Sequence, residues 1–214
     1  MSLQLQIALD RIELERAVEI TAAVAPHTDW IEVGTSLIKR FGITAVREVA
    51  AAAGPVPVLA DLKTPDDASY EFTLAYEAGA ASATVLGCAG DATLDAAVHV
   101  AAEHGREVVV DLMETTGERR AALAARLPSG VVLAAHVAKD AQRAGGSPTE
   151  LLGPWRRGRR VAVAGGLTAA DLPAFASGPD DVRVIVGSAV TGAVDPEAAA
   201  RTLAAAASRV PFPS

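Results

Sequence analysis

The sequence predicts a single (β/α)8 barrel over residues 1–214, and two patterns lead to that prediction. Short apolar runs rich in β-branched residues alternate with alanine-rich stretches of helical spacing. The alternation repeats eight times, with no change in composition that would mark a linker. Eight consecutive strand–helix units close into a barrel, whereas an open, doubly wound sheet would need only about five or six strands.

The expected strands are apolar at nearly every position, which is typical of parallel strands covered on both faces. They are residues 5–9, 30–33, 56–60, 82–86, 108–110, 131–135, 161–164 and 182–186. The expected helices are residues 14–24, 44–53, 67–78, 91–104, 117–127, 149–155, 168–176 and 196–208. Two of these helices have clear start signals: Thr168 with Asp171 forms a capping box, and Asp195 precedes Pro196 at the first helical position.

Composition narrows the class of protein. With 50% hydrophobic residues, the chain can bury a core, and its single cysteine excludes a disulfide framework. No apolar run is long enough to cross a bilayer and no secretory signal is visible, so we expect a cytoplasmic protein with no membrane partner. The net charge of −7 argues against nucleic acid as the main partner. The one basic cluster is expected to be a solvated loop or helix end, and it comprises Arg156, Arg157, Arg159 and Arg160.

Ionisable residues and glycines gather where the predicted strands end. Active sites of (β/α)8 barrels lie at the carboxyl ends of the strands, so these residues are expected to share one rim. They are Asp10, Glu32, Asp61, Lys63, Asp66, Gly87, Asp111, His136, Lys139, Asp140, Gly165, Gly166, Gly187 and Ser188.

The groups from the second and third strands have a definite expected geometry. Asp61 and Lys63 are two residues apart, so on an extended strand both side chains would point into the barrel mouth. Glu32 lies within an otherwise apolar strand and needs a partner, because an unpaired buried charge costs several kcal/mol. That partner is either Lys63, in a buried salt-bridge network, or a divalent cation shared with Asp61. Mg²⁺ prefers this kind of oxygen ligand.

The remaining rim residues suggest a phosphorylated substrate and a proton carrier. Glycines after the seventh and eighth strands lie where barrels of this class commonly bind phosphate through backbone N–H groups. His136 is the one histidine at a predicted strand end, and imidazole titrates in the range useful for catalysis. Cys88 also lies near a strand end, but no histidine accompanies it, so we expect a small buried residue there.

Several of these segments together resemble the orotidine 5′-phosphate decarboxylase suprafamily. They are residues 5–10, 31–35, 59–66 and 85–87, and the resemblance extends from about Leu3 to Val210. The Asp-x-Lys-x-x-Asp motif at Asp61, Lys63 and Asp66 defines only the suprafamily. Glu32 and the segment around Asp10 are similar to the metal-dependent branch, which holds 3-hexulose-6-phosphate synthase and 3-keto-L-gulonate-6-phosphate decarboxylase.

The resemblance implies a role for each matching residue. Glu32 and Asp61 would hold Mg²⁺, which stabilises an enediolate formed on a ketose phosphate. Lys63 would donate a hydrogen bond to that enediolate, and His136 would move protons at the reacting carbon. The resemblance also implies a homodimer with shared active sites. The remaining implied site residues are Asp10 and Asp66 in the polar cluster, with Asp66 serving the partner's site, and Gly166, Gly187 and Ser188 at the phosphate.

Three positions bear on which activity the resemblance implies. Asp111 and Ala164 are similar to the synthase, whereas Lys139 departs from both enzymes and would favour a substrate with a carboxylate. The leading hypothesis is therefore aldol condensation of formaldehyde with ribulose 5-phosphate. Decarboxylation of 3-keto-L-gulonate 6-phosphate is the alternative. Two further hypotheses are orotidine 5′-phosphate decarboxylation, which needs no metal, and a sugar-phosphate-binding barrel without catalysis.

Overall fold

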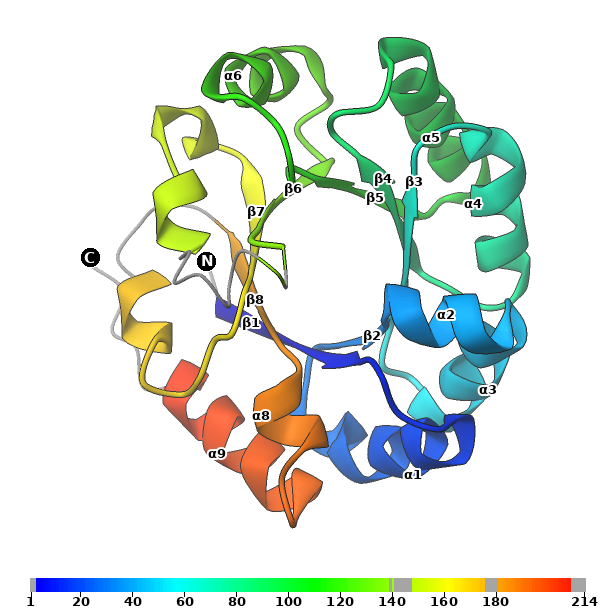
Figure 1. Ribbon diagram of the computed structural model, residues 1–214, viewed down its shortest axis with the longest axis vertical. Coiled ribbons are helices and arrows are strands. Elements are labelled where there is room, and N and C mark those ends of the chain that lie inside the picture. The colour runs from blue at the N-terminus through cyan, green and yellow to red at the C-terminus, as the bar shows by residue number, and fades with distance from the viewer. Residues whose placement is uncertain (1–2, 139, 141–147, 176–180, 209–214) are drawn as a thin grey trace.

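The protein is a closed barrel of eight parallel strands paired in chain order from β1 to β8, as predicted (Figure 1). The computed structural model describes residues 3–138, 140, 148–175 and 181–208. The last strand returns to the first and closes the barrel, with Ile7 of β1 opposite Val186 of β8. Helices surround the ring of strands in Figure 1, which is the arrangement of a (β/α)8 barrel.

Seven strands lie within two residues of their predicted bounds, and the third is longer than predicted. The strands are β1 (Leu3–Leu9), β2 (Trp30–Val33), β3 (Val58–Thr64), β4 (Ser82–Leu86), β5 (Glu107–Asp111), β6 (Val132–His136), β7 (Arg160–Ala164) and β8 (Val182–Val186). Because β3 continues to Thr64, Asp61 and Lys63 lie within the strand rather than after it.

The α-helices follow the predicted periodicity closely on the first half of the barrel. They are α1 (Leu14–Val24), α2 (Thr35–Phe41), α3 (Thr44–Ala53), α4 (Ala68–Glu77), α5 (Asp91–His104), α6 (Gly117–Arg126), α8 (Ser188–Thr191) and α9 (Pro196–Ser208). The short helices α2 and α8 were not predicted. The predicted cap of the last helix is confirmed, since Asp195 Oδ1 accepts a hydrogen bond of 2.9 Å from the Ala198 N–H.

Two predicted helices are instead short 3-10 turns. In place of residues 149–155 there are η2 (Pro148–Leu151) and η3 (Pro154–Arg156), because Pro154 disfavours helical backbone at the residue before it. In place of residues 168–176 there is η4 (Leu172–Phe175), which contains Pro173. A proline inside a helix removes a hydrogen bond and clashes with the preceding turn. Asp171 still accepts hydrogen bonds from Thr168, so the capping residues close a turn rather than start an α-helix. A third such turn, η1 (Ala25–His27), follows α1.

Alternation along the strands divides the apolar residues into two cores. Residues such as Leu5, Ile7 and Leu9 point outward and pack under the helices. The inward-facing residues Leu59, Val109, Val132, Ala134 and Ala162 form a smaller apolar layer inside the barrel. This inner layer fills the middle of the barrel and leaves the polar side chains to its two ends.

The prediction that the arginine cluster is solvated is wrong for Arg159 and Arg160. Arg159 is buried and donates hydrogen bonds to the carbonyl oxygens of Leu127 and Pro128, at 2.9 and 2.8 Å. Arg160 Nη2 lies 2.8 Å from Glu107 Oε2 at the amino-terminal end of the strands. Arg159 is therefore not solvated, and Arg160 is a half-exposed residue of β7 paired with a carboxylate rather than part of a solvated loop or helix end. Among the described residues, no helix has the length and apolar character needed to cross a bilayer.

A substitution at Gly34 tests the close approach of β1 and β2 at the rim. A Cβ there would lie 2.7 Å from the Leu9 carbonyl oxygen and 2.9 Å from the Asp10 Cβ. We expect Gly34→Ala to lower the free energy of unfolding by about 1–3 kcal/mol, measured by denaturant titration. Gly130→Ala is the control, because a Cβ at Gly130 meets no atom within 4 Å. Equal stability of the two variants would contradict the tight contact.

Candidate active site

A cavity of about 550 Å³ opens at the carboxyl ends of the strands. Its volume is in the usual range for small-molecule sites. Of the predicted site residues, those that line it are Asp10, Glu32, Asp61, Lys63, Asp111, His136, Gly166, Gly187 and Ser188. Asp66 is exposed and does not line it, and Lys139 lies outside the described residues.

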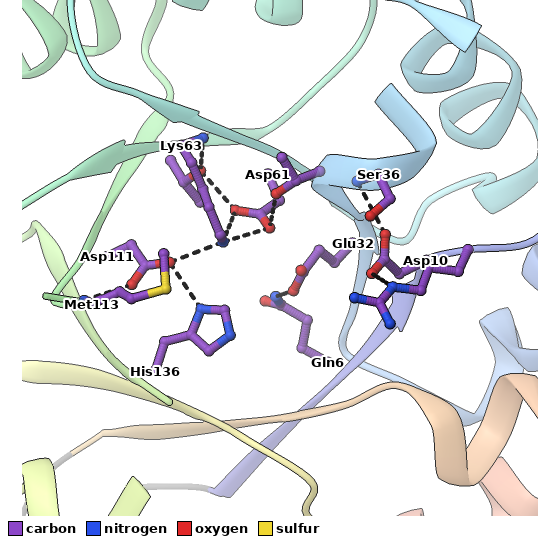
Figure 2. Close-up of polar contacts among 12 residues, drawn as sticks. Gln6, Asp10, Glu32, Ser36, Asp61, Lys63, Asp111, Met113 and His136 are labelled. Atoms are coloured by element: carbon purple, nitrogen blue, oxygen red, sulfur yellow. Dashed lines mark hydrogen bonds and ion pairs between the residues drawn. The ribbon is translucent and has the colours of Figure 1, made fainter. Parts of the chain in front are cut away.

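Lys63 is the centre of the polar cluster in this cavity (Figure 2). Its Nζ lies 2.8 and 2.7 Å from the two carboxylate oxygens of Asp61, and 2.9 Å from Asp111 Oδ2. Burial disfavours the charged ammonium, but the negative charges of Asp61 and Asp111 outweigh that effect and raise the pKa of Lys63. Lys63 is therefore a permanent cation and hydrogen-bond donor at the barrel mouth.

The backbone at Lys63 differs from the extended strand that the sequence predicts. Its φ is +51°, and the pairing of β3 with β4 shifts register between Ala60 and Thr64. A β-bulge of this kind redirects a side chain, and a non-glycine residue at positive φ costs roughly 1 kcal/mol or more. The Lys63 N–H is satisfied by Thr84 Oγ1 at 2.8 Å. Lys63 and Asp61 thus meet within an irregular stretch of β3 rather than on a regular extended strand.

Asp61 is held from three sides. Thr84 Oγ1 donates a 2.9 Å hydrogen bond to its Oδ1, Thr35 Oγ1 donates a 2.6 Å bond to its Oδ2, and Lys63 contacts both oxygens. Neither Thr84 nor Thr35 was among the site residues predicted from the sequence. A polar residue within the apolar run of β4 was the available signal for Thr84, since a buried hydroxyl needs a partner.

Glu32 is buried beside this cluster, and no cationic side chain of the described residues forms an ion pair with it. Burial raises the pKa of the Glu32 carboxyl, and the charge of Asp61 raises it further, whereas Lys63 and a hydrogen bond from Gln6 lower it. The hydrogen bond runs from Gln6 Nε2 to Glu32 Oε2 at 2.5 Å. Lys63, one of the two partners that the sequence suggested for Glu32, therefore affects this carboxylate by its charge and forms no ion pair with it.

The buried Asp111 and the half-buried His136 form a pair on the other side of Lys63. The His136 Nδ1 lies 2.9 Å from Asp111 Oδ2, and Met113 N–H donates to Asp111 Oδ1 at 2.9 Å. Burial opposes the charged Asp111 carboxylate, but His136 and Lys63 hold its pKa at about 2. Because Nδ1 donates to the carboxylate, the Nε2 of a neutral His136 remains able to accept a proton.

The remaining predicted residues lie around the edge of the cavity. Asp10 Oδ1 accepts a 3.1 Å hydrogen bond from the Ser36 N–H, and it lies beside Arg11 rather than beside Lys63. Gly165 and Gly166 have φ values of +141° and +68°, a backbone that glycine adopts without strain. The expectation of a buried Cys88 is wrong, since this side chain is exposed outside the cavity.

Comparison with known proteins bears on the identity of this cavity. The sequence model of the orotidine 5′-phosphate decarboxylase / HUMPS family matches residues 3–203. A 3-hexulose-6-phosphate synthase of Mycobacterium gastri is 37% identical over 206 residues, covering 95% of this chain and 99% of the relative.

Two solved structures are similar over nearly the whole chain. The 3-hexulose-6-phosphate synthase from Salmonella typhimurium is 34% identical, with a TM-score of 0.87, covering 97% of this chain and 99% of that one. The 3-keto-L-gulonate-6-phosphate decarboxylase from Vibrio cholerae is 28% identical, with a TM-score of 0.84, covering 98% of this chain and 99% of that one.

The pairing of Asp111 with His136 predicts that substitution of Asp111 shifts the pKa of His136. Burial lowers the pKa of His136, but the hydrogen bond and charge of Asp111 raise it above its usual value. We expect Asp111→Asn to lower the pKa of His136, measured by NMR titration of the imidazole signals, because burial then acts without that compensation. Glu114→Gln is the control, since Glu114 is an exposed carboxylate on the loop after β5. An unchanged His136 pKa in Asp111→Asn would contradict the pairing.

The same pair gives the pH dependence of stability a definite sign. The pKa of His136 is raised on folding. Its contribution to the free energy of unfolding is therefore complete below about pH 6.5 and is lost as the pH rises through the pKa of the folded state. The pKa of Asp111 is lowered from 3.8 to about 2, so its contribution is present above 3.8 and is lost as pH falls toward 2.

Proposed function

Because the chain belongs to the orotidine 5′-phosphate decarboxylase / HUMPS family, we propose that it is a carbon–carbon lyase acting on a ketose phosphate, specifically a 3-hexulose-6-phosphate synthase. The substrate pair would be ribulose 5-phosphate and formaldehyde, and the proposed location is the cytoplasm. The observation that carries this proposal is the half-buried cation Lys63 held between Asp61 and Asp111 at the mouth of the barrel. The small Ala164, which lines the cavity, is a second position at which the sequence resembles the synthase.

The proposed reaction needs a base, a stabilised oxyanion and a proton donor. Removal of a proton from the carbon beside the ketone gives an enediolate, and that carbon then attacks the carbonyl carbon of formaldehyde. The formaldehyde oxygen takes a proton, so the aldol product has the same net charge as the reactants. We assign the proton transfers to His136 and the hydrogen bond to the enediolate oxygen to Lys63. A donor fixed before the reaction stabilises a developing oxyanion more than it stabilises the ketone.

The carboxylates of Glu32 and Asp61 fit the divalent cation of this proposal. Both line the cavity, and burial beside Asp61 makes the negative charge of Glu32 costly unless a cation offsets it. Among the described residues, no cluster of three or more His, Cys, Asp or Glu residues is arranged for a metal. Mg²⁺ is usually held by one or two carboxylates together with substrate oxygens and water. When bound, Mg²⁺ would supply positive charge beside the oxygens of the substrate.

The phosphate of the substrate is assigned to the loops after β7 and β8. Gly166, Gly187 and Ser188 line the same cavity as Lys63, and these two loops are the usual phosphate site of (β/α)8 barrels. A Cβ at Gly187 would meet the Ala8 carbonyl oxygen at 3.6 Å, so the backbone there runs close to β1.

Decarboxylation of 3-keto-L-gulonate 6-phosphate is the second candidate, favoured by the likeness to the Vibrio cholerae decarboxylase. An enediolate is common to both reactions, so the same Lys63 and His136 would serve either one. The sequence adds Lys139 as a cation for the departing carboxylate, a role that stays a prediction.

Turnover assays test the proposal directly. With Mg²⁺, purified protein should condense ribulose 5-phosphate with formaldehyde at a higher kcat/KM than it decarboxylates 3-keto-L-gulonate 6-phosphate. Excess chelator should abolish turnover, and Asp61→Asn should do nearly the same, because it removes a proposed metal ligand and a partner of Lys63. Asp95→Asn, an exposed carboxylate on α5, is the matched control. Full activity in chelator would refute the metal assignment, and faster decarboxylation would favour the second candidate.

A homodimer with shared sites is also proposed, and Asp66 provides its test. Asp66 is exposed just beyond β3 and does not line the cavity of its own barrel. If it serves the partner's site, Asp61→Asn and Asp66→Asn should each be inactive as homodimers, and mixing the two after reversible dissociation should restore part of the activity. Tyr70→Ser, an exposed neighbour on α4, controls for surface effects. An active monomer in sedimentation, or no recovery from dimers that do exchange, would contradict shared sites.

A further inference from the structure

Gln6 is a fully buried amide whose two ends contact different charged groups. It lies on β1 and faces the barrel interior. Its Nε2 donates a 2.5 Å hydrogen bond to Glu32 Oε2, and its Oε1 accepts a 3.3 Å hydrogen bond from Arg183 Nη1. Among the described residues, Gln6 is the one that donates a hydrogen bond to the Glu32 carboxylate. Figure 2 shows the Gln6 amide beside Glu32, at the edge of the cluster around Lys63.

The chemistry of these partners fixes which way the amide points. A guanidinium can only donate hydrogen bonds, so Arg183 must face the carbonyl oxygen of Gln6. The amino group of Gln6 is then directed at Glu32, and a carboxylate is the acceptor it requires. A rotated amide would leave the guanidinium facing an NH2 group and would leave the carboxylate without its donor.

Arg183 is itself held from the amino-terminal end of the barrel. Its guanidinium pairs with both oxygens of Glu107, at 3.0 and 3.1 Å, and lies 3.9 Å from the ring centroid of Trp30. Only 2% of Arg183 is exposed. Bidentate pairing with a carboxylate and stacking on an aromatic ring together leave a guanidinium little freedom.

We propose that Gln6 and Arg183 are positioning residues for Glu32. Arg183 sets the orientation of the Gln6 amide, and the amide occupies Oε2 of Glu32, which would leave Oε1 for the cation. This inference rests on the proposed function, in which Glu32 is a ligand for a divalent cation. The geometry of that ligand would depend on side chains that reach through the barrel from its opposite end.

The effect of the hydrogen bond from Gln6 to Glu32 should be measurable as a change in metal affinity, without any measurement of turnover. Partners that hold a metal-binding side chain commonly change affinity by 10–100-fold when they are removed. Mn²⁺ is a suitable probe, because the electron paramagnetic resonance signal of free Mn²⁺ reports binding without any substrate. The Mn²⁺ affinities of wild type and of Asp61→Asn, which lacks a proposed metal ligand, give the upper and lower limits for comparison.

Gln6→Met and Arg183→Met are the test variants. Gln6→Met keeps the side-chain length but removes the donor to Glu32, and we expect it to weaken Mn²⁺ binding about tenfold or more. Arg183→Met does not alter a residue that touches Glu32, yet it should weaken binding in the same direction, because the Gln6 amide loses the group that orients it. Arg160→Met is the control, since Arg160 also pairs with Glu107. It should leave affinity unchanged, and circular dichroism should report a native fold for every variant compared.

The outcomes separate this inference from the proposed function. If wild type binds Mn²⁺ no more tightly than Asp61→Asn does, the metal site fails and the inference fails with it. If wild type binds Mn²⁺ and folded Gln6→Met binds it equally, the positioning role is overturned while the metal site stands. If Gln6→Met does not fold, Arg183→Met decides. Weaker binding than in Arg160→Met supports the inference, and equal binding overturns it.

Discussion

The ammonium of Lys63 is the one charge on which the rest of the barrel mouth depends. Asp61 and Asp111 come from different strands, and each lies within hydrogen-bond distance of its Nζ. Without it, two buried carboxylates would face each other beside Glu32, at a cost of several kcal/mol for each unpaired charge. Lys63 therefore lets Glu32, Asp61 and Asp111 lie close together at one side of the cavity, and its positive charge also suits that cavity to a substrate that develops negative charge.

The backbone is distorted to place that ammonium. Had β3 continued without the bulge, Lys63 would have kept its ladder pairing with β4. Instead its N–H bonds to the Thr84 hydroxyl, and the same hydroxyl donates to Asp61. One threonine thus satisfies the irregular backbone and fixes the carboxylate that Lys63 binds. The strained backbone at Lys63 is stable because neighbouring groups take over the displaced hydrogen bonds.

The sequence predicted the barrel well because its elements have simple periodicities. The apolar strands and alanine-rich helices repeat in register with the fold, and residues such as Asp111 and His136 fall at strand ends where side chains must meet. It could not predict the bulge at Lys63, because a shift in register between β3 and β4 leaves no mark on the apolar pattern of either strand. Nor did it identify Gln6 as a site neighbour, because the predicted barrel does not show which side chains of β2 and β8 lie within hydrogen-bond distance of this amide. Proline positions also overrode the helical pattern near Pro154 and Pro173.

The interior of the barrel has polar groups at both ends and an apolar layer between them. Leu59, Val109 and Val132 belong to that layer, and it separates the Arg183–Glu107 pair from the charges at the mouth. Gln6 connects the two ends, because a neutral amide crosses the interior at lower desolvation cost than a charged side chain would. Burial lowers the pKa of Arg183, and the negative charges of Glu107 and, more weakly, Glu32 oppose that effect without cancelling it. Side-chain packing at the amino-terminal end of the barrel is therefore linked, through Gln6, to the orientation of the Glu32 carboxylate near its mouth.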